Sequence, residues 1–158
     1  MQFNYQNDIK WKDAMMTEKE EVWKDTLGQY GCLITSLANI IQIHRNIDFT
    51  PQNLNETIKT HKAYWYPFKS QEEANASFLD WDKFCQIFKC NVTESERYKK
   101  TLDGYHIAKV RVQGSPHYIN VVLNSKSIFW CYDVWDGKIK QYSIDDIEKF
   151  KQITFEEK

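Results

Sequence analysis

The apolar residues in the first half of the chain recur at helical spacing. Over residues 32–44 they cover more than one helical stripe, which predicts a central, buried helix. Thr50 and Pro51 predict the N-cap and the first position of a second helix over residues 51–60, because a threonine oxygen accepts a backbone N–H there and proline lacks one. The spacing of aromatic residues predicts a third helix over residues 78–88.

The second half of the chain changes to a period of two. This alternation predicts strands over residues 107–112, 117–123, 128–135 and 139–142. Asp136-Gly137 predicts a tight turn between the last two strands. The sequence from Ser143 to Asp146 resembles a capping box and predicts a short terminal helix that ends at Phe150.

Helices in the first half and strands in the second half indicate an α+β fold in which the strands form an antiparallel meander. Residues 1–27 are mostly polar, with Trp11 and Trp23 as isolated anchors, and residues 17–23 suit a short helix or a lid. No repeat, low-complexity stretch or linker rich in Pro, Gly or Ser interrupts the chain. We therefore expect a single domain over residues 1–158.

The composition excludes several kinds of partner. The formal net charge is -1 and the basic residues are spread along the chain, so we expect no nucleic-acid partner. The N-terminus lacks the pattern of a signal peptide, and no apolar run reaches the roughly 18 residues that span a membrane, so we expect a soluble protein without a membrane partner. The four cysteines fit a reducing compartment better than a disulfide framework. The 15% of aromatic residues suits a groove that holds an extended ligand.

Cys32 has the features of a reactive thiol. It follows Gly31 at the predicted start of the central helix, where unpaired backbone N–H groups and the positive end of the helix dipole stabilise a thiolate. The same N–H groups can bind an oxyanion, and a glycine leaves space for a substrate carbonyl and tolerates a strained backbone. The alternative is that Cys32 is a core residue, as buried cysteines often are.

His117 and Asp133 are candidates to complete a nucleophilic site. His117 heads the second predicted strand, at the polar edge of an apolar sheet. If residue 123 pairs with residue 127, the antiparallel ladder pairs residue 117 with residue 133 and places both side chains on one face, whereas a slip of one residue turns Asp133 away. On its strand His117 is expected to share a face with Ile119, Val121 and Leu123.

Each of these residues also has a simpler explanation. His117 alone could be a hydrogen-bonded surface histidine, and Asp133 alone could serve the following turn. His106 or Asp136 could also replace a member of the set. Taken together, Cys32, His117 and Asp133 supply a nucleophile, a base and an orienting carboxylate, which acyl transfer through a thioester requires.

A metal site is the other chemistry that the cysteines and histidines could support. Cys85 and Cys90, with His61 or His106, form one cysteine pair without the second pair that zinc sites of this kind need. His44 closes the central helix, where a cation interacts favourably with the helix dipole, so we expect a structural role for it. No phosphate-binding loop, serine elbow or paired-carboxylate motif is present. We therefore expect neither a metal nor a cofactor.

Several segments, in their order along the chain, resemble one family. They are Gln6-Asn7-Asp8 with Trp11, the run LGQYGCLITSLA that starts at Leu27, Thr50-Pro51 with Leu54-Asn55, His117-Tyr118-Ile119, and Asp133-Val134-Trp135-Asp136-Gly137. With them the chain resembles, over nearly its whole length, the peptidase C39-like domains, which are papain-like cysteine peptidases. Similar variants occur in proteins of bacteriophages and of the bacteria that phages infect. The resemblance implies a papain-like fold in which a central Cys-bearing helix packs on a C-terminal antiparallel sheet.

The resemblance also implies a role for individual residues. Cys32 would be the nucleophile, His117 the general base and acid, and Asp133 the residue that orients His117. Gln6 would donate a side-chain hydrogen bond to the oxyanion, a role for which Gln29 is the alternative. The residues expected to contact the substrate are Gly31, Tyr30 and Trp135.

The expected function is therefore that of a cysteine peptidase or amidase acting on a peptide or protein. By the phage resemblance, the candidate substrates are peptidoglycan peptides and viral or host proteins, and the candidate locations are the cytoplasm of a bacterial host and the virion. One alternative is a binding or structural module that keeps the fold without turnover, such as a virion component or an inhibitor of a host protein. Another is an acyltransferase with the same three groups and a different acceptor.

Overall fold

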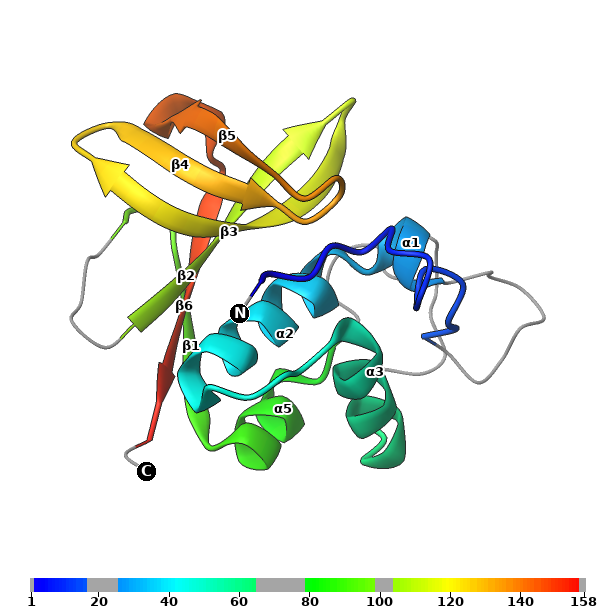
Figure 1. Ribbon diagram of the computed structural model, residues 1–158. Coiled ribbons are helices and arrows are strands. Elements are labelled where there is room, and N and C mark those ends of the chain that lie inside the picture. The colour runs from blue at the N-terminus through cyan, green and yellow to red at the C-terminus, as the bar shows by residue number, and fades with distance from the viewer. Residues whose placement is uncertain (1, 17–25, 65–78, 99–103, 157–158) are drawn as a thin grey trace.

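The computed structural model describes residues 2–16, 26–64, 79–98 and 104–156, and places a group of helices against a six-stranded antiparallel sheet (Figure 1). The helices are α1 (Leu27–Tyr30), α2 (Cys32–Arg45), α3 (Pro51–Thr60) and α5 (Trp81–Phe88). They precede the strands, so the expected α+β fold is confirmed. The short helix or lid predicted over residues 17–23 lies outside the described residues.

The caps explain where the helices begin. Thr50 Oγ1 accepts the backbone N–H of Asn53 at 3.1 Å, and α3 starts at the next residue, as its sequence predicts. Asp80 accepts the N–H of Lys83 at 3.2 Å, so α5 begins at Trp81, later than the predicted residue 78, which lies outside the described residues. Among the described helices, none is both long and apolar enough to cross a membrane.

The sheet contains the predicted meander and two further strands. The strands are β1 (Cys90–Ser95), β2 (Gly104–Val112), β3 (Ser115–Ser125), β4 (Ile128–Asp133), β5 (Lys138–Ser143) and β6 (Lys149–Phe155). Their order across the sheet is β1-β6-β2-β3-β4-β5, and every neighbouring pair is antiparallel. Consecutive pairing from β2 to β5 confirms the meander.

The predicted terminal helix is wrong. The capping box at Ser143 is present, but it opens only a short 3-10 helix over Ile144–Asp146. The chain then forms β6, which enters the sheet between β1 and β2. Its alternating side chains fill both faces, since Phe150 packs on one side of the sheet and Ile153 on the other. This non-local pairing outweighs the local capping signal.

The β3–β4 register differs from the predicted one by an even number of residues at the candidate site. Asn120 pairs with Tyr132, two residues away from the predicted alignment, and a bulge lies between Val121 and Leu123. An even shift keeps Asp133 on the face of His117. Past the bulge the face alternation changes, and Leu123 is 62% exposed although it was expected to share a face with Ile119, which is buried.

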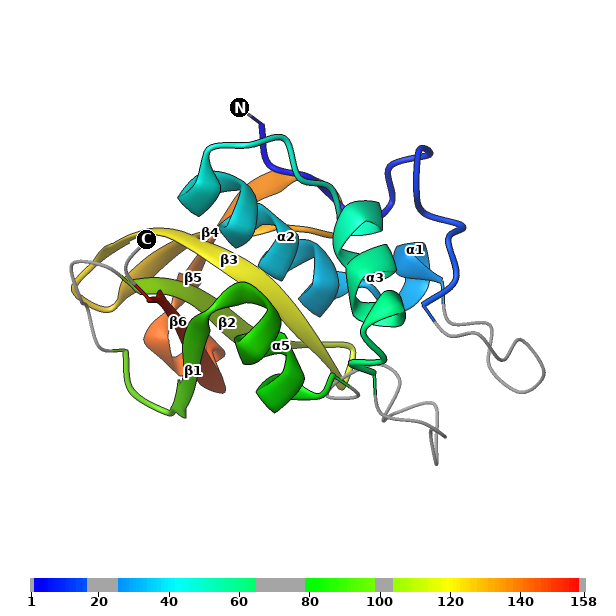
Figure 2. The same ribbon diagram turned by 90° about the horizontal axis from the view of Figure 1, so that it is seen from below.

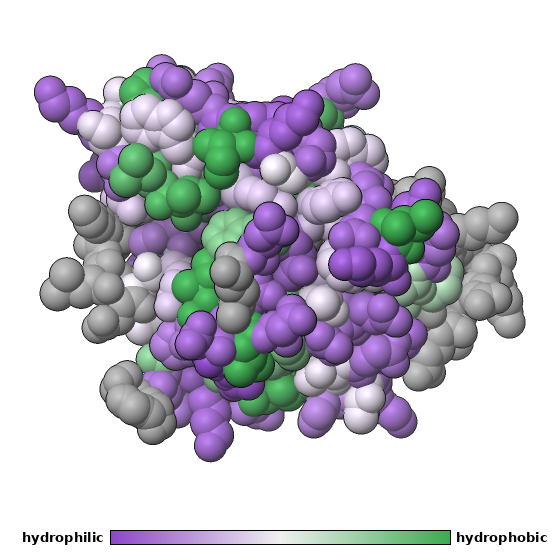
Figure 3. Space-filling view, in the orientation of Figure 1, coloured by the Kyte–Doolittle hydropathy of each residue, from purple (hydrophilic) through white to green (hydrophobic). Residues whose placement is uncertain are grey.

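Two hydrophobic clusters occupy opposite faces of the sheet. The larger joins the helices to the sheet and includes Leu37 and Ile41 of α2 with Ile107 of β2. The smaller includes Ile119 and Phe129. Each fully buried side chain of this size contributes about 2 kcal/mol. Figure 2 shows α2 lying along β3, which sets the position of the start of α2 relative to the start of β3. Figure 3 shows a mostly hydrophilic face with hydrophobic side chains gathered over the upper part of the sheet.

Candidate active site

Cys32 is the first residue of α2, and Gly31 separates it from the short helix α1. No side chain caps this helix end and no acidic residue lies in its first turn, so the early N–H groups and the helix dipole act on the Cys32 side chain without competition. Cys32 is only 5% exposed. This placement provides the backbone donors and the positive potential that the sequence predicted for a thiolate.

The structure explains a glycine at position 31 by a reason other than the predicted one. Its φ of -90° is not in the left-handed region. A Cβ at this position would lie 2.4 Å from the carbonyl oxygen of Leu27, so the close approach of α1 requires a glycine. Gly31 is buried and does not line the cleft described below. The side chains of Tyr30 and Gln29 lie outside the part of the chain that is described.

Polar side chains on one face of α2 fix this helix against β3. Ser36 Oγ donates to the carbonyl of Tyr118 at 3.2 Å, and Asn120 Nδ2 donates to the carbonyl of Ser36 at 3.0 Å. Asn39 Nδ2 donates to Asn120 Oδ1 at 3.0 Å. Ser36 and Asn39 follow Cys32 by four and seven positions, so all three share one face of the helix. These bonds therefore set the distance between Cys32 and the start of β3.

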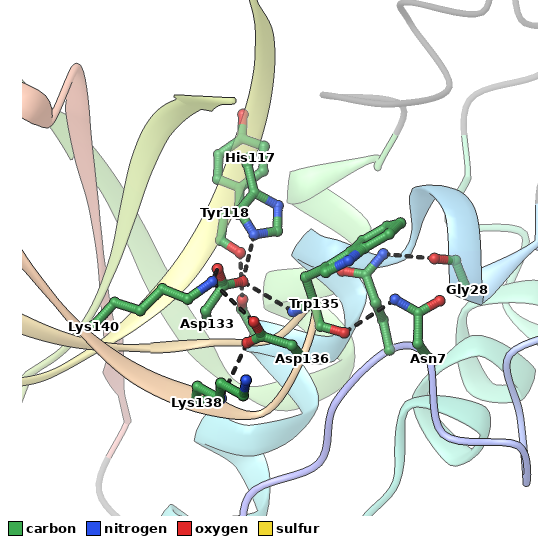
Figure 4. Close-up of polar contacts among 11 residues, drawn as sticks. Asn7, Gly28, His117, Tyr118, Asp133, Trp135, Asp136, Lys138 and Lys140 are labelled. Carbon is green, nitrogen blue, oxygen red and sulfur yellow. Dashed lines mark hydrogen bonds and ion pairs between the residues drawn. The ribbon is translucent and has the colours of Figure 1, made fainter. Parts of the chain in front are cut away.

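His117 and Asp133 form the predicted pair. His117 Nε2 lies 2.7 Å from Asp133 Oδ1, and both side chains are buried. The same Oδ1 accepts the backbone N–H of Trp135 at 2.9 Å. Figure 4 shows His117, Lys140 and the Trp135 backbone converging on the Asp133 carboxylate. Because Nε2 is occupied by Asp133, Nδ1 is the ring nitrogen left for other contacts.

Cys32 lines the same cleft as His117 and Asp133, so the structure brings all three residues together. Burial of the ring disfavours its charged form, but the hydrogen bond with Asp133 and the nearby Cys32 outweigh this and raise the pKa of His117 from 6.5 to about 9. His117 is therefore predominantly an imidazolium at neutral pH. A cation beside a cysteine at a helix N-terminus is the environment that favours a thiolate.

Lys140, which the sequence analysis did not identify, completes the surroundings of Asp133. Its Nζ lies 2.6 Å from Asp133 Oδ2 and 3.0 Å from Asp136 Oδ2. Burial favours the neutral form of Asp133, but the hydrogen bonds it accepts hold the pKa of this carboxyl well below its usual 3.8. Asp133 therefore stays ionised throughout the neutral range. Asp136 contacts Lys140 and has no contact with His117 among the described interactions.

Gln6 reaches the site from the N-terminal segment. Its backbone N–H donates to the carbonyl of Val134 at 2.7 Å, and its Nε2 donates to the carbonyl of Gly28 at 2.9 Å. The amide nitrogen carries two hydrogens, and the Gly28 carbonyl uses one of them. Gln6 Oε1 is buried without a hydrogen-bond partner among the described residues. The side chain is thus anchored at the cleft with one N–H left to donate.

These residues line one cleft of about 500 Å³. Its walls come from the N-terminal segment, the start of α2, the β2–β3 hairpin and the β4–β5 hairpin. The lining residues are Gln6, Cys32, Val112, Gln113, Ser115, Pro116, His117, Asp133, Trp135, Lys140 and Tyr142. Val112 and Trp135 are each 48% exposed, so apolar surface flanks the buried reactive groups. Trp135 thus lines the cleft, as expected of a residue that contacts a substrate.

The other three histidines do not take part in the candidate site and have contacts of their own. His106 packs against Tyr98 in a tilted arrangement with ring centroids 4.6 Å apart and lines a separate cavity of about 230 Å³. His44 stacks on Phe155 at the end of α2, with centroids 4.0 Å apart, in the structural role expected of it. His61 Nδ1 contacts the carbonyl of Thr57.

Cys85 and Cys90 are free thiols, and burial raises the pKa of both, that of Cys90 to about 12. Protonated thiols of this kind are poor metal ligands and poor nucleophiles. In the described part of the chain, no three residues among His, Cys, Asp and Glu gather into a possible metal site.

The sequence matches no family model and no curated protein. A function for the chain therefore has to be inferred from the side chains around the cleft. The arrangement there can take a proton from a thiol, keep the resulting imidazolium beside the sulfur, and present hydrogen-bond donors to an oxygen that becomes charged.

Proposed function

We propose that the protein is a papain-like cysteine peptidase or amidase that cleaves a peptide-type bond through a thioester on Cys32. The observation that carries this proposal is that Cys32, at the N-terminus of α2, lines the same cleft as the hydrogen-bonded pair His117 and Asp133. A buried cysteine without function needs no charged histidine beside it. The family resemblance of the segments around Gln6, Cys32, His117 and Asp133 supports the same reaction.

The reaction would begin with a Cys32 thiolate and a His117 imidazolium. The sulfur attacks the substrate carbonyl, and the developing oxyanion accepts hydrogen bonds from the Cys32 backbone N–H and the Gln6 amide. His117 then donates its proton to the leaving amine, which departs and leaves an acyl-enzyme. In the second half His117 takes a proton from water, and the hydroxide attacks the thioester and releases the acid.

The cleft favours a peptide substrate with uncharged side chains near the bond to be cut. Val112 and Trp135 offer exposed apolar surface beside the reacting groups. The charged lining groups are already paired with each other, since Lys140 lies between Asp133 and Asp136. Peptides or proteins of the cell wall, a host or a phage remain the candidate substrates by the family resemblance.

The pH dependence of Cys32 alkylation tests the proposal. Each cysteine of wild type and of His117→Ala would be followed by mass spectrometry after treatment with iodoacetamide. We expect Cys32 to react rapidly at about pH 6 and to slow at least tenfold in His117→Ala, because an imidazolium stabilises its thiolate. Cys85 is the internal control, since burial raises the pKa of this half-buried thiol and it should react only at higher pH.

An inert Cys32, or one that titrates like an ordinary thiol near about pH 8.5 in both proteins, would contradict the proposed enzymatic activity. A binding function would then be the better proposal. If Cys32 is activated, a peptide library with mass analysis of products identifies the substrate. Added amines then separate hydrolysis from acyl transfer, because only a transferase gives an amide of the added amine.

A further inference from the structure

Lys140 reaches the candidate site from the strand next to Asp133. In the β4–β5 ladder Asp133 pairs with Lys138, and Lys140 lies two residues further along β5 on the same face. Lys140 Nζ nonetheless contacts the carboxylate, at 2.6 Å from Oδ2, whereas among the described ion pairs Lys138 has none. Figure 4 shows Lys140 extended toward Asp133 and Asp136, whereas Lys138 contacts Asp136 through its backbone N–H, at 3.1 Å from Oδ1. The ion pair between Lys140 and Asp133 therefore does not follow from direct pairing in the β4–β5 ladder.

The two oxygens of Asp133 have different partners. Oδ1 accepts from His117 and from the Trp135 backbone, and Oδ2 binds Lys140. A carboxylate held at both oxygens cannot rotate away from the imidazole. Lys140 also binds Asp136, so it connects the carboxylate to the loop that carries Trp135 on the wall of the cleft.

We propose that Lys140 is a positioning residue of this active site, which holds Asp133 toward His117 and offsets part of its charge so that His117 can release its proton to the leaving group. This role rests on the proposed function. Its effect on the His117 ring, however, does not require turnover and can be measured separately.

The charges around His117 explain why a cation is needed to offset part of the negative charge of Asp133. The groups that face it are Cys32 from α2, Asp133 from β4 with Asp136 beyond it, and Lys140 and Tyr142 from β5. When His117 gives its proton to the leaving amine, the Cys32 sulfur is bonded to the substrate carbon, so the negative groups are the two carboxylates, and the cation among these groups is Lys140. Without that cation the negative charges would hold the proton on His117 more firmly, and a weaker acid transfers its proton to a leaving amine more slowly.

An NMR titration of the histidine rings tests this role directly. The chain has four histidines, and the His117 signals are identified by their absence in His117→Ala. We expect the His117 midpoint to rise by about one pH unit in Lys140→Met, since a neighbouring charge within a few ångströms shifts a titration by that order. Lys138→Met removes the same charge from the same strand without touching Asp133 and should leave the midpoint in place. Lys140→Arg keeps the cation and should restore the wild-type value.

A double variant separates positioning from a general effect of charge. In an Asp133→Asn background, Lys140→Met should shift the His117 midpoint by less than half as much, because the group through which Lys140 acts is no longer charged. Thermal unfolding of each variant establishes that it is folded. An unchanged midpoint in Lys140→Met, a fall in it, or an equal shift in Lys138→Met would overturn the proposal.

Kinetics then show whether the effect reaches the reaction. With a peptide substrate, Lys140→Met should lower kcat about tenfold, leave KM nearly unchanged and move the alkaline limb of the rate profile upward by the shift measured in the titration. A rise in KM with kcat unchanged would instead make Lys140 a substrate contact. If Cys32 is not activated in wild type, the proposed function fails, while the ring titration still decides what Lys140 does to His117.

Discussion

The buried side chain of Gln6 combines a structural cost with a candidate role in catalysis. It is only 1% exposed, its backbone N–H is bonded to Val134 and its amide nitrogen to Gly28. The unpaired Oε1 would cost about 1–3 kcal/mol in a purely structural residue. Such a cost is accepted where a side chain has to present its other end to a ligand.

Replacing Gln6 by alanine should therefore reduce turnover and spare the nucleophile. We expect kcat in Gln6→Ala to fall about a hundredfold, because one donor to the oxyanion is lost. The rate of Cys32 alkylation by iodoacetamide should stay within about threefold, since that reaction forms no oxyanion. Gln141→Ala, at an exposed position of β5, is the control and should keep wild-type kcat. Equal losses of kcat and alkylation rate in Gln6→Ala would assign Gln6 to the fold alone.

Individual residues of the candidate site could be predicted where a reactive residue type occupies an unusual position in the sequence. A cysteine after a glycine at a helix start, and a histidine at a strand start, stand out because both positions are unusual for a core residue. Lys140 could not be found in this way, because a lysine on an edge strand is ordinary and its contact with Asp133 depends on the register of β4 and β5. The signal for Ser36 and Asn39 was present, as polar positions on the Cys32 face of a mostly apolar helix.

At the scale of elements, α2 and β3 are the pair that builds the site. Hydrophobic contacts hold them together without directional preference, whereas the buried amides allow one alignment. Asn39 is central, because it also bonds the backbone of Asn4 on the N-terminal segment, at 2.7 and 3.1 Å. Asn39 thus joins three segments that are distant in the sequence.

Asn39→Ala should destabilise the protein and misalign Cys32. The change removes the partner of Asn120 Oδ1 and of the Asn4 backbone N–H and carbonyl, so we expect the free energy of unfolding to fall by on the order of 3 kcal/mol, measured by urea denaturation. Asn91→Ala, at an exposed position of β1, should change it by less than about 0.5 kcal/mol. In folded Asn39→Ala, Cys32 alkylation should also be slower. A loss no greater than that of Asn91→Ala would show that packing alone aligns α2.

The helices were predicted better than the sheet, for a physical reason. Caps and helical spacing act within about ten residues, and α2 and α3 follow them closely. The strand β6 pairs with β1 across more than fifty residues, which no local pattern reports. The β3–β4 bulge likewise has no signal in the sequence, and the shared face of His117 and Asp133 survived only because the shift at their end is even.

At the scale of the molecule, the cleft depends on segments from both ends of the chain. Asn7 donates to the carbonyl of Trp135 at 3.0 Å, a contact that spans 128 positions. Gln6 and the β4–β5 loop are therefore brought to the start of α2 only when the whole fold is formed. It follows that the ionisation of the site is coupled to global stability, because the groups regain ordinary titration when the chain unfolds.

The free energy of unfolding should accordingly be greatest in mildly acidic solution. The folded pKa of His117 is about 9 against 6.5 for the free side chain, so its contribution is complete below about pH 6.5 and is lost as the pH rises toward 9. The pKa of Asp133 is lowered, so its contribution is complete above about pH 4 and is lost in more acidic solution. The Cys32→Ala background tests this, because in wild type a thiol that loses its proton on folding offsets the proton that His117 gains. We expect urea denaturation of Cys32→Ala to show a fall on the order of 2 kcal/mol between about pH 6.5 and pH 9, because Asp133 still holds a proton on the ring. In the same background His117→Ala should be less stable at pH 6 and nearly independent of pH over this range, because the ring that loses its proton is gone. A decline of equal size with and without His117 would locate the pH dependence in other groups and contradict a charged His117 beside Asp133.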